Sequence, residues 1–206
     1  MKIYFDGDSW CRGTEIKPDE RRLSYRFSAL VSKELGAEEH NISRGGVSNN
    51  RIARQLLVDN DISQYDLAII QMVYPFRSEY YNDDQKKWLT ICPSSIAEDP
   101  STVKYLRWTK KKKMLERKRI DYEYWAKYYR EIYNDTYGNA YEEMFYTAIR
   151  NHCELKNVKL ILMSHHYHTK LNFDLKLQVP KYPQTPKGHP TEEGHRLIAD
   201  DILKLL

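Results

Sequence analysis

The sequence predicts a doubly wound α/β protein, in which a parallel sheet lies between two helical layers in a three-layer α/β/α sandwich. Two nearly continuous apolar runs, at 67–73 and 158–163, are typical of strands buried on both faces of a parallel sheet. Segments with apolar residues at helical spacing alternate with these runs, as crossover connections require. The 206 residues, 41% of them hydrophobic and 30% charged, fit a single domain with a sizeable core at 1–206.

The first elements are predicted from their apolar pattern and from the turn-forming and helix-ending residues that bound them. A strand at 2–5 is predicted to stop at the turn-forming residues Asp6-Gly7-Asp8. A helix at 25–35 carries apolar residues on one side and ends at Gly36, because glycine favours the left-handed position that follows many helices.

Capping residues define the later helices. A helix around Ile52 is predicted to begin at a cap supplied by Ser48 or Asn49. The last helix, at 192–206, follows Thr191 as its cap.

A long segment at 74–157 separates the third strand from the fourth and is predicted to be an insertion. Its first part, through Pro93 and Pro100, is expected to be irregular, and 103–153 is expected to be helical. Aromatic residues recur here every four positions: Trp125, Tyr129, Tyr133, Tyr137, Tyr141 and Phe145. Such a row drifts around a single helix, so either the helix breaks near Gly138-Asn139 or the rings face more than one neighbour. A packing stripe is the expected role, and an aromatic substrate platform is the alternative.

Charge is distributed unevenly along the chain. There are 33 basic and 29 acidic residues, a net charge of +4, yet Lys104 to Arg119 holds nine basic residues against one acid. We interpret this run as a solvated helix face. The alternative is a patch for an anionic polymer, with Tyr105 and Trp108 as stacking surfaces.

Several classes of protein are not indicated. The apolar start is too short for a signal peptide and no window reaches about 18 apolar residues, so a cytoplasmic protein without a membrane partner is expected. Cys11, Cys92 and Cys153 are odd in number and far apart, which indicates neither a disulfide framework nor a thiolate zinc site. Three histidines follow the fourth strand: His165, His166 and His168. Without a nearby Cys or HExxH helix they make a poor metal signature, so no metal or cofactor is expected.

Three short stretches could carry chemistry. The first is Gly7-Asp8-Ser9-Trp10, which places a serine at the carboxyl end of a parallel strand, where open α/β sheets bind ligands. The second is the loop at 43–50, in which glycines free backbone N–H groups for close approach to a ligand. The third is Gly188-His189-Pro190, before the last helix, which holds a histidine on a loop where it could act as a general base. Each alone is also compatible with an ordinary turn or cap.

Together and in this order, the three stretches resemble the SGNH, or GDSL-like, hydrolase family. The resemblance implies a flavodoxin-like sandwich and a serine esterase without a cofactor. It implies that Ser9 is the nucleophile and that His189 is the base. The N–H groups of Ser9 and Gly46 would form the oxyanion hole.

Two departures from the family pattern concern the same site. The third block of the family usually supplies an Asn as an oxyanion donor, and none occurs here, so Asn49, Gln71 or Arg77 would have to replace it. The acid of the triad is expected three residues before the histidine, where this chain has Pro186. The acid is therefore unassigned, and a backbone carbonyl, Glu192 or Asp174 are the alternatives considered for orienting the imidazole.

The sequence thus predicts an esterase that acts on acylated carbohydrate or another small ester. Side chains expected to line the substrate rim are Asp8, Trp10, Arg77, His165, His166 and His168. The alternative is a weak or inactive member that uses the basic aromatic insertion to bind nucleic acid or an anionic glycan. Glu79 is expected to pair with Arg77, and His195 is expected to pack or cap within the last helix.

Overall fold

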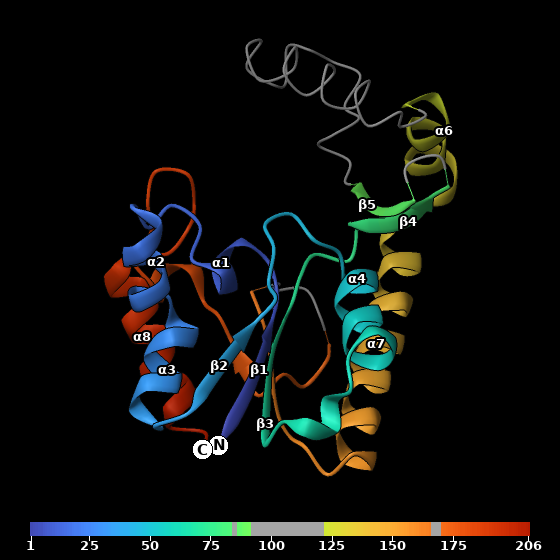
Figure 1. Ribbon diagram of the computed structural model, residues 1–206. Helices are drawn as coiled ribbons and strands as arrows, with labels where there is room; N and C mark the ends of the chain where they lie inside the picture. Colours follow the sequence, from blue (N-terminus) through green and yellow to red (C-terminus); the bar gives the residue numbers. More distant parts are fainter. Residues whose placement is uncertain (84–85, 92–121, 166–169) are drawn as a thin grey trace.

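The central sheet has five strands, all parallel. The computed structural model describes residues 1–83, 86–91, 122–165 and 170–206 (Figure 1). The strands lie in the order β2-β1-β3-β6-β7. Their bounds are β1 Lys2–Asp6, β2 Glu38–Asn41, β3 Leu67–Met72, β6 Lys159–Ser164 and β7 Leu175–Lys176. This is the flavodoxin-like order, in which ligands bind beyond the carboxyl ends of the strands, where the order reverses.

Helices cover both faces of the sheet, which confirms the three-layer sandwich (Figure 1). One layer holds α2 Asp19–Tyr25, α3 Phe27–Glu34 and α8 Glu192–Leu203, and the other holds α4 Asn49–Arg54 and α7 Asp135–Leu155. The short helix α1 (Ser9–Arg12) follows β1 directly, at the carboxyl end of the sheet. Shorter helical turns lie at Gln55–Asp59, Ile62–Gln64 and Val179–Lys181.

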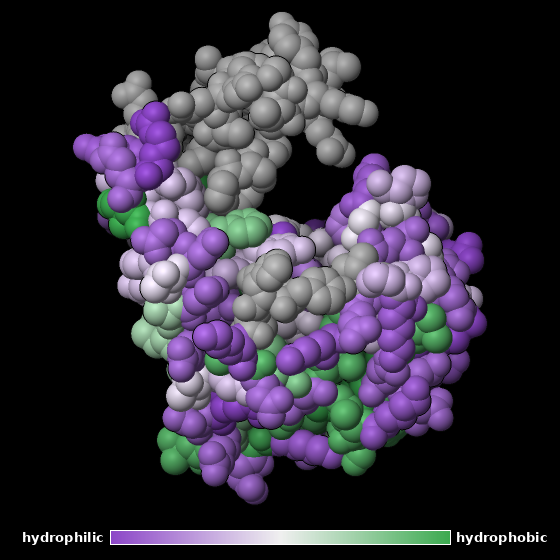
Figure 2. Space-filling view, turned by 180° about the vertical axis from the view of Figure 1, so that it is seen from behind, coloured by the Kyte–Doolittle hydropathy of each residue, from purple (hydrophilic) through white to green (hydrophobic). Residues whose placement is uncertain are grey.

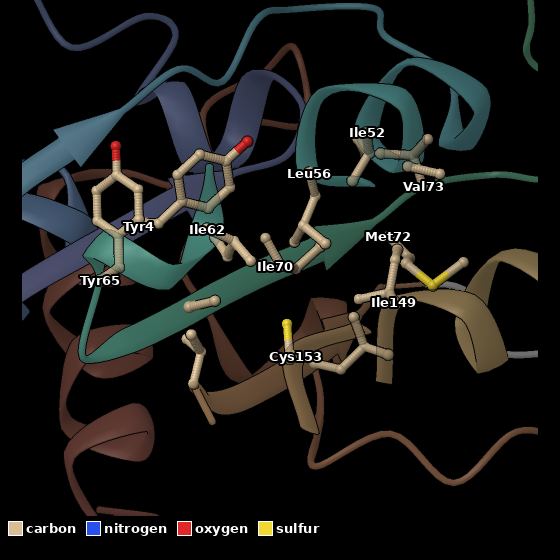
Figure 3. Close-up of a cluster of buried hydrophobic side chains, with 14 of the residues drawn as sticks. Tyr4, Ile52, Leu56, Ile62, Tyr65, Ile70, Met72, Val73, Ile149 and Cys153 are labelled. Carbon is tan, nitrogen blue, oxygen red and sulfur yellow. The ribbon is translucent and has the colours of Figure 1, made fainter. Parts of the chain in front are cut away.

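Side chains alternate between two hydrophobic cores because successive strand residues point to opposite faces. Tyr4, Ile70 and Leu162 face α4 and α7, as the close-up in Figure 3 shows for the first two. Phe5 and Ile69 face α3 and α8 on the other side. Burial on both faces explains why β3 is apolar throughout.

Residues 78–82 and 87–91 form an antiparallel strand pair, where irregular structure was predicted. Strands β4 (Ser78–Asn82) and β5 (Lys87–Ile91) pair antiparallel and stand apart from the main sheet. Two side chains of β5, Leu89 and Ile91, are buried in a small cluster. Tyr80, Trp125 and Tyr129 pack against them. The basic run Lys104 to Arg119 lies outside the described residues, so its predicted roles stay predictions.

The helical break in the aromatic segment lies before Gly138, not at it. Helix α6 (Tyr122–Lys127) continues through the turn Tyr128–Ile132, and α7 begins after Asn134, whose side chain accepts from the Tyr137 N–H. The C-terminal half of α7 packs in the core, with Ile149 and Cys153 buried. The segment predicted as an insertion therefore includes the helix that crosses from β3 to β6.

Two predicted helices have different bounds in the structure. The helix expected at 25–35 is α3, which begins only at Phe27 because Arg26 is extended. The preceding helix α2 was not predicted. The Arg26 guanidinium between them donates twice to Glu39, at 3.0 and 2.9 Å. The last helix ends at Leu203. Ser48 and Thr191 are the caps, as predicted.

The surface is mostly hydrophilic on the face opposite to Figure 1. Apolar side chains gather mainly in its lower half (Figure 2). Within the described ranges, none of the helices combines the length and the apolar character needed to cross a membrane.

Candidate active site

Ser9 is the first residue of α1, on the turn that follows β1. The Asp8 carboxylate caps this helix by accepting the Trp10 N–H at 3.0 Å. Ser9 is half-buried, and its hydroxyl makes no hydrogen bond to any residue that the structure describes. The hydroxyl is therefore free to be engaged by a base or a substrate.

The loop that carries His189 is joined directly to α1. The Trp10 indole N–H donates to the carbonyl oxygen of Gly188 at 3.1 Å. Thr185 closes the loop, because its N–H donates to the His189 carbonyl at 2.8 Å and its carbonyl accepts from Gly188 at 2.9 Å. The residue after Ser9 is thus hydrogen-bonded to the residue before His189.

Glu15 provides a carboxylate for His189. Nδ1 of His189 lies 3.3 Å from Oε2 of Glu15, and it makes no well-aligned hydrogen bond to any described residue. Lys187 approaches the other carboxylate oxygen at 2.8 Å, and the Thr185 hydroxyl donates to Oε2. Hydrogen bonds from Lys187 and then Thr185 lower the pKa of Glu15 to about 2, so the group stays ionised. Glu15 also has a φ of 80°, a left-handed conformation that is costly for a non-glycine residue and often occurs at functional sites.

The acids considered from the sequence lie elsewhere. Glu192 pairs with Arg21 at 2.8 Å. Asp174 accepts from Arg150 at 3.0 Å and from the Leu162 N–H at 2.7 Å. Neither carboxylate orients His189 in this structure, because each is held by its own partners.

The glycine loop runs beside the Ser9 turn. The Arg44 N–H donates to the Gly7 carbonyl at 3.1 Å, and a Cβ added at Gly45 would lie 3.7 Å from Cβ of Ser9. Gly46 has a φ of 77°, which favours glycine, and no described group accepts either its N–H or that of Ser9. These two amides are thus available to a ligand, and their assignment to the oxyanion hole stays a prediction.

A buried ion pair anchors the same loop. Arg51 of α4 contacts Asp6 at the end of β1 and donates to the Ile42 carbonyl at 2.7 Å. Both side chains are almost fully buried. The pair fixes the loop to the strand that carries Ser9.

Gln71 is a buried side chain beneath the site that forms hydrogen bonds to three of its residues. Its Oε1 accepts from the Cys11 N–H at 3.0 Å, so its Nε2 faces Oδ1 of Asp8 at 3.1 Å and Nδ1 of His165 at 2.9 Å. Nδ1 of His165 must then be an acceptor, and the ring proton is assigned to Nε2. Burial lowers the pKa of His165, which agrees with a neutral ring. Because all its polar groups are used, Gln71 serves the architecture of the site rather than the predicted oxyanion hole.

Exchange of Gln71 for Leu is expected to lower the free energy of unfolding by about 3 kcal/mol, because the Cys11 N–H and one Asp8 oxygen lose a buried partner. Urea unfolding measures this change. Gln64→Leu, at an exposed glutamine, is the matched control and should shift stability by less than about 0.5 kcal/mol. Equal effects of the two exchanges would contradict the role assigned to Gln71.

The other two predicted oxyanion donors have different surroundings. The Asn49 side chain clamps the main chain of Val73, donating to its carbonyl at 2.9 Å and accepting its N–H at 2.8 Å. Arg77 donates through Nη1 to Asp8 at 3.1 Å and to the Val47 carbonyl at 3.3 Å. Its Nε and Nη2 have no hydrogen-bond partner among the described residues.

Several residues predicted at the rim are buried beneath it. Asp8 is 2% exposed, His165 is 5% exposed and Trp10 is 6% exposed, because the His165 ring stacks on Trp10 and Asp8 caps α1. Arg77 is partly exposed, as a rim residue would be. His166 and His168 lie outside the described residues.

Two minor predictions have clear outcomes. The expected Arg77–Glu79 pair is wrong, because the Arg54 guanidinium donates twice to Glu79 at 3.1 Å. His195 is buried and packs, as predicted, against Phe27 of α3, and its Nδ1 accepts from the Phe27 N–H at 3.3 Å. Burial lowers the pKa of His195 to about 3, so its ring is neutral.

Sequence reasoning missed two residues at this site, Glu15 and Thr185. Both lie in loops without a recognisable motif, and Glu15 is far from His189 along the chain. The only signal in the sequence for a role of Glu15 was its position a few residues after Ser9.

Comparisons with known proteins agree with the sandwich. No protein-family model and no curated protein sequence matches the chain. A carbohydrate esterase structure aligns over 98% of this chain and 63% of its own, with a TM-score of 0.53 and 13% identity. A lipase from a goat rumen metagenome aligns over 100% and 97%, with a TM-score of 0.51 and 10% identity. A lipolytic protein of the G-D-S-L family from Desulfitobacterium hafniense DCB-2 aligns over 100% and 99%, at a TM-score of 0.40 and 13% identity. The two alignments with a TM-score above 0.5 show that the chain shares its α/β/α fold with that carbohydrate esterase and that lipase.

Proposed function

We propose that this SGNH-like sandwich is a serine esterase with Ser9 as nucleophile, His189 as general base and Glu15 as the acid that orients the base. The observation that carries the proposal is the hydrogen bond between the Ser9 turn and the His189 loop. Trp10 binds Gly188 at 3.1 Å, next to both reactive residues, and Glu15 faces Nδ1 of His189 at 3.3 Å. With Nδ1 directed at a carboxylate, Nε2 is the nitrogen left to accept a proton.

The reaction then has two halves. Nε2 of His189 takes the proton of the Ser9 hydroxyl as Oγ attacks the ester carbonyl carbon. The bond to the alcohol oxygen breaks, and the imidazolium returns the proton to that oxygen. A water molecule, deprotonated by the same Nε2, then attacks the acyl carbon. The bond to Oγ of Ser9 breaks, and the imidazolium returns the proton to Oγ as the carboxylic acid leaves. The ionised Glu15 stabilises the imidazolium in both halves.

The oxyanion is stabilised by the unused amides of Ser9 and Gly46 in this proposal. The family's third donor is an Asn, and Arg77 is the substitute with the most unused donors, because Gln71 is fully occupied and Asn49 clamps Val73. A guanidinium in that place would also add a full charge opposite the developing negative oxygen.

The proposed substrates are small esters, including acylated carbohydrates. Two structural neighbours with a TM-score above 0.5 are a lipase and a carbohydrate esterase, which supports ester cleavage as the reaction class. The mixed polar and aromatic surroundings of Arg77 favour an alcohol part with several hydroxyl groups.

Covalent labelling tests the proposal. A fluorophosphonate should modify the folded chain once, at Ser9, and an aryl acetate should be hydrolysed. Ser9→Ala should lose both, whereas Ser63→Ala, at an exposed serine, should keep both. A folded protein that neither reacts at Ser9 nor hydrolyses the ester would contradict the proposed function.

A further inference from the structure

A pocket lies between the aromatic helix α7 and the turn that follows β3. It is a shallow pocket open to solvent, with an interior of about 40 Å³, and about 360 Å³ when the open space at its mouth is counted. Residues that the argument uses line it: Asn50, Arg77, Tyr133, Tyr137, Tyr141 and Glu142. Arg77 joins this pocket to the candidate active site, because the same guanidinium donates to Asp8, the residue before Ser9.

One wall of the pocket is a ladder of aromatic rings. The ring centroids of Tyr133 and Tyr137 are 6.2 Å apart, those of Tyr137 and Tyr141 are 4.6 Å apart, and Tyr141 is 40% exposed. Tyr133 lies across Gly138, where an added Cβ would come within 2.2 Å of the Tyr133 hydroxyl. The glycine is thus required for the close approach that shapes this wall.

Glu142 brings an unsatisfied carboxyl group to the same pocket. Its side chain is on the buried face of α7, the residue is 2% exposed, and Oε1 has no hydrogen-bond partner among the described residues. Burial raises the pKa of Glu142 to about 7. A buried carboxyl without a partner is costly, and such a group in a native structure calls for an explanation. A ligand that donates to it would supply the missing partner.

We propose that this pocket binds the sugar ring of the ester substrate, with the tyrosine rings against its C–H face and Glu142 and Arg77 on its hydroxyl groups. The inference rests on the proposed esterase function and names its alcohol part. A purely apolar ligand would leave Glu142 and Asn50 without partners. A cationic ligand would have to lie beside the Arg77 guanidinium, and the tyrosines form a row rather than a closed cage.

Two acetyl esters separate the pocket from the chemistry. The first is para-nitrophenyl acetate, which carries no sugar, and the second is a mono-O-acetylated methyl glucopyranoside. In Glu142→Gln, KM for the sugar ester should rise by about 10-fold or more, because a hydrogen bond to a charged group is lost. Under the same conditions kcat/KM for para-nitrophenyl acetate should stay within about two-fold. Glu143→Gln, an exposed carboxylate one residue on, is the matched control and should leave both values unchanged.

Stability shows whether Glu142 has a structural role instead. Burial raises its pKa in the folded state to about 7, above the ordinary value of a glutamate, so the folded state binds the proton more tightly and loses stability as the carboxyl ionises with rising pH. Glu142→Gln should therefore unfold at higher urea concentration than the unaltered chain near about pH 8, and the gain should vanish near about pH 4. A less stable variant at both pH values would overturn the assignment of Glu142 to a ligand.

Measuring the binding of a sugar that carries no ester separates the proposed sugar pocket from the proposed esterase activity. Methyl β-glucopyranoside, followed by NMR of the tyrosine rings, should bind the unaltered chain and Ser9→Ala alike. Its affinity should fall by about 10-fold or more in Glu142→Gln and in Tyr137→Ala. Binding without ester cleavage supports the pocket and contradicts the esterase. Ester cleavage with no glucoside binding, an unchanged KM in Glu142→Gln, or binding of tetramethylammonium instead would overturn the sugar assignment.

Discussion

Exchange of His189 for Asn is expected to abolish ester hydrolysis, with kcat lower by about 10⁶-fold or down to the background rate. The imidazole is the base for both the Ser9 hydroxyl and the hydrolytic water, so its loss stops each half of the reaction. Initial rates with para-nitrophenyl acetate measure the effect. The fold should survive, because the His189 side chain is partly exposed and lies on a loop that main-chain hydrogen bonds of Thr185 already close.

His152→Asn is the matched control for that exchange. His152 lies near the C-terminal end of α7, on an element that carries none of the three proposed triad residues. It should keep the full rate. If His189→Asn also kept the rate, the base would have to be another group and the assignment of His189 would be wrong.

Exchange of Glu15 for Gln is expected to lower kcat by about 10⁴-fold, the loss typical of a triad that loses its acid. The amide keeps the size of the side chain but cannot stabilise the imidazolium or hold the imidazole in the tautomer that leaves Nε2 basic. Because the pKa of Glu15 is about 2, its carboxylate stays ionised at any ordinary pH, and the acid limb of the pH–rate profile should not be due to Glu15.

Glu192→Gln is the matched control for Glu15→Gln. Glu192 lies only three residues after His189 in the sequence but pairs with Arg21, so the exchange should leave kcat within about two-fold. Circular dichroism and urea unfolding show whether each variant is folded. Equal rates for the two variants would contradict the assignment of Glu15.

The sequence predicted the layers of this fold well because burial leaves a strong pattern. Strands β3 and β6 are apolar runs, since both of their faces are covered. Strand β2 has no such signal, because Glu38–Asn41 is a polar edge strand that is only half covered. The strand pair β4–β5 was missed for a related reason: its buried residues, Leu89 and Ile91, pack on the aromatic helices and not on the main sheet.

Only those residues of the candidate site that lie in a recognisable local sequence motif could be predicted. Ser9 and His189 each lie next to a turn or cap with a recognisable sequence, so their place at the carboxyl edge of the sheet could be expected. Glu15 comes to His189 through tertiary contact, after a turn without a motif, and therefore leaves no local signal. The same holds for Gln71, whose neighbours Asp8 and His165 come from two other parts of the chain.

The most direct test of the central claim is the rate at which a fluorophosphonate modifies Ser9 in the unaltered chain, in Glu15→Gln and in Glu192→Gln. This reaction requires the nucleophile, its base and the acid, and it does not depend on the choice of substrate. We expect modification at Ser9 in the unaltered chain and in Glu192→Gln at equal rates, and a rate lower by about 10³-fold or more in Glu15→Gln. Equal rates in all three, or modification at another residue, would contradict a Ser9–His189–Glu15 triad.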